Sequence, residues 1–173
     1  MDYPPGLAAD YWNPFPSEPT HRFALGRRGS KPLVALAMNP SHADESRSDR
    51  TINRLAEASV TLKYDGWLML NLYPERSPSP RGLGPFDRSL SDANCVAIID
   101  ELSANGVSNV LGAWGNPPHP TIRMAKVEVL KALKGAGIGV FYFGTKTLLG
   151  NPRHPNPRAR PWDISGPAVD LPL

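Results

Sequence analysis

The stretch that decides the fold is Pro32-Leu-Val-Ala-Leu-Ala-Met38, an apolar run that stops at Asn39-Pro40. A short apolar run without alternation is typical of a β-strand that is buried on both faces. Further stretches of this kind predict strands over residues 67–72, 109–114 and 138–143. Segments with helical spacing separate them. The alternation predicts an α/β fold with three layers, in which helices cover both faces of a central, mainly parallel four-stranded sheet.

The intervening segments carry apolar residues at the spacing of amphipathic helices. Helices are expected over residues 51–63, 91–105 and 121–134. Ser91 is the expected N-cap of the second helix, because a serine hydroxyl commonly accepts the first free amides of a helix. The buried face of that helix is expected to consist of Val96, Ile99 and Leu102.

A single domain accounts for the 173 residues of the chain, which are enough to bury a hydrophobic core. Residues 1–20 are rich in proline and aromatic side chains and predict an extended N-terminal arm. Residues 21–157 form the expected α/β core, which begins with an N-terminal edge strand over residues 21–25. Residues 158–173 form a Pro-rich C-terminal tail.

Charge and local composition limit the classes of protein to consider. The start, Met1-Asp2-Tyr3-Pro4-Pro5, lacks the basic and apolar regions of a signal peptide, and no apolar stretch reaches the ~20 residues that cross a bilayer. Cys95 is the only cysteine, so no internal disulfide can form, and its place within a helix favours a core role. The net charge of +3 permits a polyanionic partner without requiring one. We expect a cytoplasmic monomer with no membrane contact and no cofactor.

Polar motifs follow each of the buried strands. The first strand leads into Asn39-Pro40-Ser41, and the second into the segment from Asn71 to Arg76. The third ends in Trp114-Gly115-Asn116, and a short loop connects the fourth to His154-Pro155. Ligands of open α/β sheets bind beyond the carboxyl ends of the strands, so we expect these motifs to share one site.

Each motif also has a purely structural interpretation. Asn39 and Asn71 could satisfy backbone groups where strands end. His154 could be an ordinary loop histidine, and the Asn-Pro and His-Pro pairs could be turn chemistry. A metal site is not expected, because the ligand spacing fits no known pattern for His42, Asp44, Asp49 and His154. A hydrolase triad of Ser41, His154 and Asp44 lacks the Gly-x-Ser-x-Gly pattern around its serine.

Arginines are concentrated in the loops that follow the strands. Singly, each is an ordinary solvated side chain, but as a set they would surround the carboxyl edge of the sheet with positive charge. Guanidinium groups are good phosphate ligands, so a phosphate-bearing partner is favoured over a neutral metabolite. Neither a Walker A loop nor a Gly-x-Gly-x-x-Gly motif is present. The set comprises Arg47, Arg50, Arg54, Arg76, Arg81, Arg88, Arg153, Arg158 and Arg160.

The motifs together resemble a bacterial and phage family of unassigned function, over roughly Arg22 to Pro157. The residues that carry this resemblance are Met38-Asn39-Pro40-Ser41-x-Ala43-Asp44, Asp49-x-Thr51-Ile52, Asn71-Leu72-x-x-x-Arg76, Ala113-Trp114-Gly115-Asn116 and Pro152-x-His154-Pro155. More distantly, the chain resembles the uracil-DNA glycosylase superfamily. The corresponding residues, in the same order, are Asn39-Pro40, Leu70-Asn71 and His154-Pro155-Asn156-Pro157.

The superfamily resemblance implies a uracil-DNA glycosylase-like fold and a role for each matched residue. Asn39 would position the attacking water, Asn71 would read the edge of an extruded base, and His154 would hydrogen-bond the departing base. Asp44 is the candidate carboxylate, since position 39 holds no acid. The further base-binding candidates are Tyr73, Ser41 and Trp114, and the phosphate-binding candidates are Arg50, Arg76, Arg153 and Arg158.

The chain departs from the superfamily pattern after His154-Pro155, where an apolar wedge usually follows. Here Arg158 stands in that segment, either to intercalate or to bind phosphate. The leading hypothesis is a DNA glycosylase-like enzyme that binds an extruded uracil-like or modified base and hydrolyses its N-glycosidic bond. The alternatives are a hydrolase or transferase of a free nucleoside or nucleotide, and a non-catalytic nucleic-acid-interacting protein. The expected partner is thus DNA, single- or double-stranded, or a nucleotide.

Overall fold

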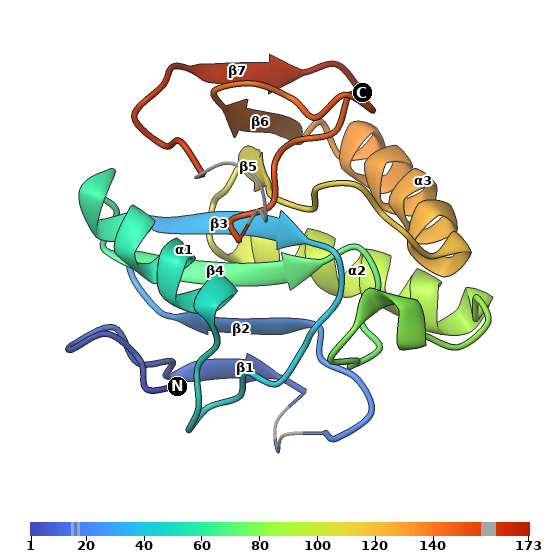
Figure 1. Ribbon diagram of the computed structural model, residues 1–173, viewed down its shortest axis with the longest axis horizontal. Helices are drawn as coiled ribbons and strands as arrows, with labels where there is room; N and C mark the ends of the chain where they lie inside the picture. Colours follow the sequence, from blue (N-terminus) through green and yellow to red (C-terminus); the bar gives the residue numbers. More distant parts are fainter. Residues whose placement is uncertain (15, 17, 157–161) are drawn as a thin grey trace.

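A mixed seven-stranded sheet with helices on both faces forms the protein (Figure 1). This computed structural model describes residues 1–14, 16, 18–156 and 162–173. The strands are β1 (Tyr11–Asn13), β2 (Ala24–Arg27), β3 (Pro32–Ala37), β4 (Gly66–Asn71), β5 (Asn109–Gly112), β6 (Gly139–Phe143) and β7 (Ala168–Leu171). The helices are α1 (Arg50–Thr61), α2 (Arg88–Ala104) and α3 (Pro120–Gly135), with a short 3-10 turn, η1 (Pro80–Gly82).

The strand order is β1-β2-β4-β3-β5-β6-β7. The strands predicted from buried apolar runs are β3, β4, β5 and β6, and all of them pair in parallel. The α/β class is therefore confirmed. The prediction of a mainly parallel four-stranded sheet with one edge strand is wrong, because three antiparallel strands extend the sheet.

Pairing at the sheet edges explains the difference. β2 is not the edge strand, because β1, from the predicted extended arm, pairs with it. At the other side β7, from the predicted tail, pairs with β6. These additions satisfy backbone groups that an open edge would expose. β1 and β7 have only three and four residues, and no buried apolar run marks them in the sequence.

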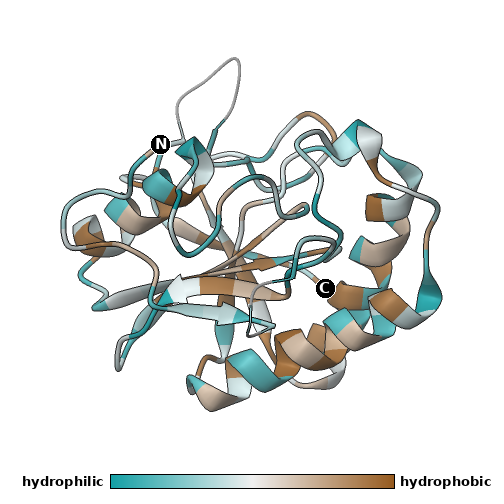
Figure 2. Cartoon of the chain, turned by 90° about the horizontal axis from the view of Figure 1, so that it is seen from below, coloured by the Kyte–Doolittle hydropathy of each residue, from teal (hydrophilic) through white to brown (hydrophobic). Residues whose placement is uncertain are grey.

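Side chains alternate between the two faces of the central strands. Leu33 and Ala35 of β3 point to one face, where they join a core with α1. Val34 and Leu36 point to the other face, where they pack with α2 and α3. Figure 2 shows hydrophobic and hydrophilic residues alternating along the helices, as this packing requires. None of the helices in the described part of the chain is both long and apolar enough to cross a bilayer.

Helix α2 differs most from its prediction. It begins at Arg88, and its N-cap is Asp87, whose carboxylate accepts the amide of Leu90 at 3.0 Å. Ser91 therefore lies inside the helix rather than at its cap. The buried stripe includes the polar residues Asn94 and Glu101, which hydrophobic spacing cannot identify.

Glu101 is buried because the arm supplies its partners. The hydroxyl of Tyr11 and the amide nitrogen of Asn13 both donate to its carboxylate. The buried face of α2 is therefore rotated relative to the predicted one, and Val96 points outward. The prediction that Val96 belongs to the buried face is wrong.

We expect substitutions at neighbouring α2 positions to separate these two faces. Ile98 is 1% exposed, so Ile98→Ala should lower the free energy of unfolding by about 2–5 kcal/mol through lost burial and a cavity. Val96 is 61% exposed, so the matched control Val96→Ala should change it by less than about 0.5 kcal/mol. Urea unfolding of both variants measures the difference, and equal losses would contradict this assignment of the faces.

Candidate functional site

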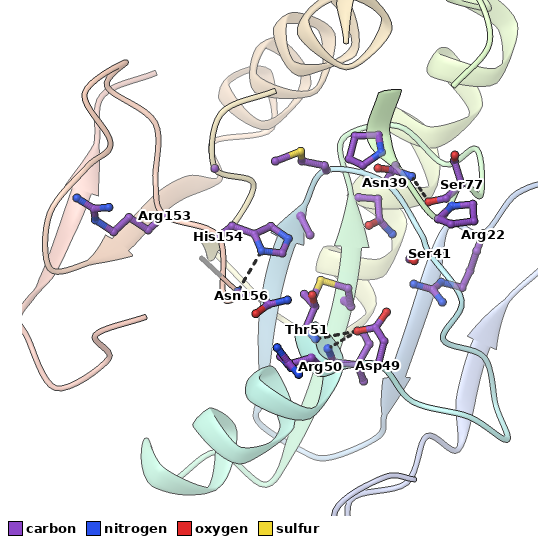
Figure 3. Close-up of a pocket in the computed structure, with 18 of the residues that line it drawn as sticks. Arg22, Asn39, Ser41, Asp49, Arg50, Thr51, Ser77, Arg153, His154 and Asn156 are labelled. Carbon is purple, nitrogen blue, oxygen red and sulfur yellow. Dashed lines mark hydrogen bonds between the residues drawn. The ribbon is translucent and has the colours of Figure 1, made fainter. Parts of the chain in front are cut away.

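A cavity of about 1110 Å³ opens at the carboxyl ends of the central strands (Figure 3). Its walls come from the segments after β3, β4, β5 and β6, together with the first turn of α1. The volume is slightly above the usual range of about 300–1,000 Å³ for small-molecule sites. The charged side chains in its lining are Arg22, Asp49, Arg50 and Arg153. This location is the one that the parallel sheet predicts.

Asn71, the last residue of β4, lines the cavity with a side chain that is only 1% exposed. Within the described residues, its Nδ2 has no hydrogen-bond partner. The backbone around it is fixed, because the amide nitrogen of Asn94 donates to the carbonyls of Asn71 and Leu72 at 2.9 and 3.1 Å. The backbone of Asn71 is therefore fixed, and among the described residues its Nδ2 is an unsatisfied donor at the wall of the cavity.

Asn39 lies two residues after β3 and also lines the cavity. Its Nδ2 donates to the carbonyls of Pro40 and Ser77, at 3.0 and 3.1 Å. The contact with Ser77 is drawn in Figure 3. Because the amide nitrogen is occupied, the amide oxygen is the group that Asn39 can offer to a ligand or water.

His154 projects from the loop after β6 on another wall of the cavity (Figure 3). Burial lowers the pKa of its imidazole, so the ring is neutral at physiological pH. The backbone amide of Asn156 donates to Nδ1 at 3.0 Å. In a neutral ring this leaves the proton on Nε2, so His154 can donate one hydrogen bond to a ligand.

Contacts from α1 and from the end of β5 hold the His154 loop in place. Arg54 of α1 donates to the carbonyl of Pro155, and the amide of Gly115 donates to the carbonyl of Pro152 at 2.9 Å. Gly115 has a φ of +65°, and a Cβ there would lie 3.1 Å from Cβ of His154. The close approach of the backbone at the end of β5 to the His154 loop, together with the left-handed φ, thus favours glycine at position 115.

Trp114 supports the same loop from behind. It is fully buried, does not line the cavity, and its indole nitrogen donates to Oδ1 of Asn151 at 3.1 Å. Lys126 of α3 donates to that oxygen at 2.7 Å, and Nδ2 of Asn151 donates to Asn116 at 3.1 Å. The structure therefore places Trp114 in the support of the site rather than at a base-binding wall.

The cavity brings together most of the candidates from the sequence. The predicted residues that line it are Asn39, Ser41, Arg50, Asn71, Arg153 and His154. The predicted residues that lie outside its lining are Asp44, Tyr73, Arg76 and Trp114. Arg158 lies outside the described residues.

Asp44 organises its own turn instead of facing the cavity. Its carboxylate accepts the backbone amides of Ser46 and Arg47, at 2.9 and 2.7 Å. Partial burial opposes ionisation, but these hydrogen bonds outweigh it and lower the pKa of Asp44. Asp44 is therefore an ionised residue whose Oδ1 holds its own turn together.

Tyr73 and Arg76 also hold loops together. The phenol oxygen of Tyr73 accepts the amide of Asp87 at 3.1 Å, and its ring stacks on Phe86 with centroids 6.1 Å apart. Arg76 donates to the carbonyl of Ala43 at 3.3 Å. Both contacts fix the segments that flank the cavity.

Two charged residues of the lining are absent from the predicted site. Asp49 is the N-cap of α1, where one carboxylate oxygen accepts the amides of Thr51 and Ile52 at 2.8 and 3.0 Å. An aspartate before a helix is a recognisable N-cap signal, so Asp49 could have been found. Arg22 could not have been found, because no local pattern separates a buried arginine from a solvated one.

Within the described residues, no group of three or more His, Cys, Asp or Glu side chains could hold a metal ion.

Gly115→Ala should disturb the cavity through His154. The added Cβ would meet His154 at 3.1 Å and would be strained by the left-handed backbone. Gly137→Ala is the matched control, because Gly137 has a φ of +70° and no neighbour within 4 Å. Each variant should lose about 1–2 kcal/mol of unfolding free energy from backbone strain. Only Gly115→Ala should shift the imidazole NMR signals of His154, and unchanged signals would contradict the proposed close approach.

Comparisons with known proteins give the chain a family. No curated protein and no solved structure matches it, so nothing found there links it to the uracil-DNA glycosylase superfamily. A family model described as a protein of unknown function, DUF1643, matches residues 22–156. This span holds the parallel strands, all three helices and every described residue of the predicted site. The chain therefore belongs to the DUF1643 family.

Proposed function

We propose that the protein is a DNA glycosylase-like hydrolase, which binds a nucleobase in the cavity and cleaves its N-glycosidic bond. The observation that carries this proposal is the unpartnered Nδ2 of Asn71 at the cavity wall. A buried donor without a partner costs about 1–3 kcal/mol, which a ligand with a carbonyl acceptor would recover. Nucleobases display such acceptors beside N–H donors along one edge, and an asparagine amide is suited to read that edge.

The state of His154 supports the same chemistry. When the bond between C1′ and the base nitrogen breaks, its electron pair passes to the base. A donor aimed at the leaving base stabilises this charge as it develops. Neutral His154, with its proton on Nε2, is such a donor. The imidazole and Asn39 come from separate walls of the cavity, so a ligand can lie between them (Figure 3).

The nucleophile in this proposal is a water molecule oriented by the amide oxygen of Asn39. Its oxygen forms the new bond to C1′ while the bond to the base breaks, as in other glycosyl hydrolyses. One water proton passes to a carboxylate and the departing base takes up a proton. Asp44 does not line the cavity, and Asp49 is the carboxylate of its described lining. We therefore assign to Asp49 the role that the sequence suggested for Asp44.

The free-nucleotide alternative has support from the size of the cavity. A volume of about 1110 Å³ leaves room for a sugar and phosphate beside a base. Arg50 and Arg153 in the lining could bind phosphates of either a nucleotide or a strand. A non-catalytic protein on this fold would fill its pocket with its own side chains, for example Tyr73 or the C-terminal tail, and neither Tyr73 nor the described part of the tail lines the cavity.

Asn71→Asp should abolish most base recognition, because it replaces a donor by an acceptor of nearly the same shape. We expect cleavage to fall about 100-fold or more. The assay measures base release from single- and double-stranded DNA with uracil, mismatched thymine or hypermodified bases, and from free nucleosides and nucleotides. Asn109→Asp makes the same change at an exposed position at the start of β5, and should leave cleavage unchanged. Absence of base release and of base binding in the wild-type protein would refute the proposal.

The lowered pKa of His154 predicts a pH dependence of stability. The unfolded histidine titrates near pH ~6.5, so below this pH the unfolded state binds more protons than the folded state. Unfolding free energy should therefore fall as the pH drops from about 6.5 towards the folded pKa. Urea unfolding at a series of pH values measures this loss. His154→Gln should reduce it, and an equal loss in this variant would assign the effect to another group.

A further inference from the structure

We propose that the cavity contains a distinct phosphate subsite, formed by the buried guanidinium of Arg22. The inference deepens the proposed function, on which it rests for the identity of the rest of the ligand. Arg22 precedes β2 and reaches into the region of the cavity where Ser41 and Asp49 also lie (Figure 3). The hydrogen bond that Nη1 donates, and the Nε that has no partner among the described residues, support this subsite.

Among the residues that the structure describes, Arg22 is a buried cation without an ion-pair partner. Its side chain is 4% exposed, yet it lines the cavity. Within the described residues, the ion pairs at 4.0 Å or less are those of Arg88 with Asp92 and Glu128. The carboxylate of Asp49 raises the pKa of Arg22 through its negative charge, but it forms no ion pair with Arg22 at 4.0 Å or less. A buried charge is normally paired because its removal from water costs several kcal/mol.

The guanidinium retains its charge at neutral pH. Burial, and then the nearby positive charge of Arg76, lower the pKa of Arg22 to about 10. Nη1 donates to the carbonyl of Ala43, and Arg76 donates to the same oxygen at 3.3 Å. Two cations thus converge on one neutral acceptor, and the carboxylates of Asp44 and Asp49 act on Arg22 without forming an ion pair with it at 4.0 Å or less among the described residues.

The edge of the Arg22 guanidinium that carries Nε has an unsatisfied donor for an oxyanion, within the described residues. Nη1 is occupied by Ala43, whereas Nε is buried and has no partner in the described part of the chain. Nε and Nη2 form the side of the guanidinium that binds two oxygens of a phosphate in parallel. The first turn of α1 is not an equivalent site, because Asp49 already accepts the amides of Thr51 and Ile52. Within the described residues, Nε of Arg22 is therefore an unsatisfied donor of the lining, in addition to Nδ2 of Asn71.

Inorganic phosphate tests the subsite without any assumption about the base. We expect saturable binding by calorimetry, and a rise in Tm above that in chloride of equal ionic strength. Arg22→Gln should weaken phosphate binding at least 10-fold. Arg123→Gln is the matched control, because Arg123 also donates to backbone carbonyls but lies exposed outside the lining. It should change the affinity less than 3-fold.

The test holds even if Arg22→Gln fails to fold. Arg22→Lys retains the charge but not the two-pronged edge, and it should also lose most of the affinity. The Tm of the wild-type protein in phosphate requires no variant. Equal Tm values in phosphate and chloride, or equal phosphate affinity in a folded Arg22 variant, would overturn the proposal.

Ligands with and without phosphate identify its source and separate this inference from the proposed function. Binding is measured for deoxyuridine, for its 5′-monophosphate and for a single strand with internal uracil. If the subsite binds a terminal phosphate, the monophosphate should bind at least 10-fold more tightly than the nucleoside. If it binds a backbone phosphate, the strand should bind at least 10-fold more tightly than the nucleoside. Arg22→Gln should remove either advantage. Phosphate binding with neither base release nor base binding would support the subsite and refute the glycosylase. Base release that is unaffected by Arg22→Gln would support the glycosylase and refute the subsite.

Discussion

A strand that is buried on both faces can place polar side chains only where it ends, and this constraint locates the site. β3 and β4 are buried along their whole length, so Asn39 and Asn71 stand at or just beyond their carboxyl ends. Parallel pairing brings these ends to one edge of the sheet. The position of the cavity is thus a consequence of the same apolar runs that form the core.

The sequence predicted those parts of the molecule that have a strong local signal. The parallel strands, the three helices and six cavity residues follow from apolar runs and from motifs at strand ends. β1 and β7 did not, because such short strands are stabilised by the edges that they cover. The sequence also could not predict the role of a side chain where that role depends on partners from distant parts of the chain. Trp114 and Tyr73 have aromatic rings suited to a base, but their hydrogen bonds to Asn151 and Asp87 place them in supporting positions.

The His154 loop shows how an irregular segment gains a defined position. It has little regular structure, yet α1, the end of β5 and α3 hold it through Arg54, Gly115 and Lys126. These contacts bury the imidazole, and burial keeps it neutral. The protonation state of one side chain therefore depends on elements distributed over most of the chain, which is why no short motif could determine it.

The two added edge strands have a consequence for the family as a whole. The family match covers residues 22–156, whereas β1 and β7 lie outside it. The shared unit is then a five-stranded sheet whose outer strands, β2 and β6, have unpaired backbone groups. Exposed edges invite pairing with other chains. We therefore expect relatives to protect these edges with flanking segments of their own, and to differ most in structure there rather than at the carboxyl edge of the sheet, where the cavity lies.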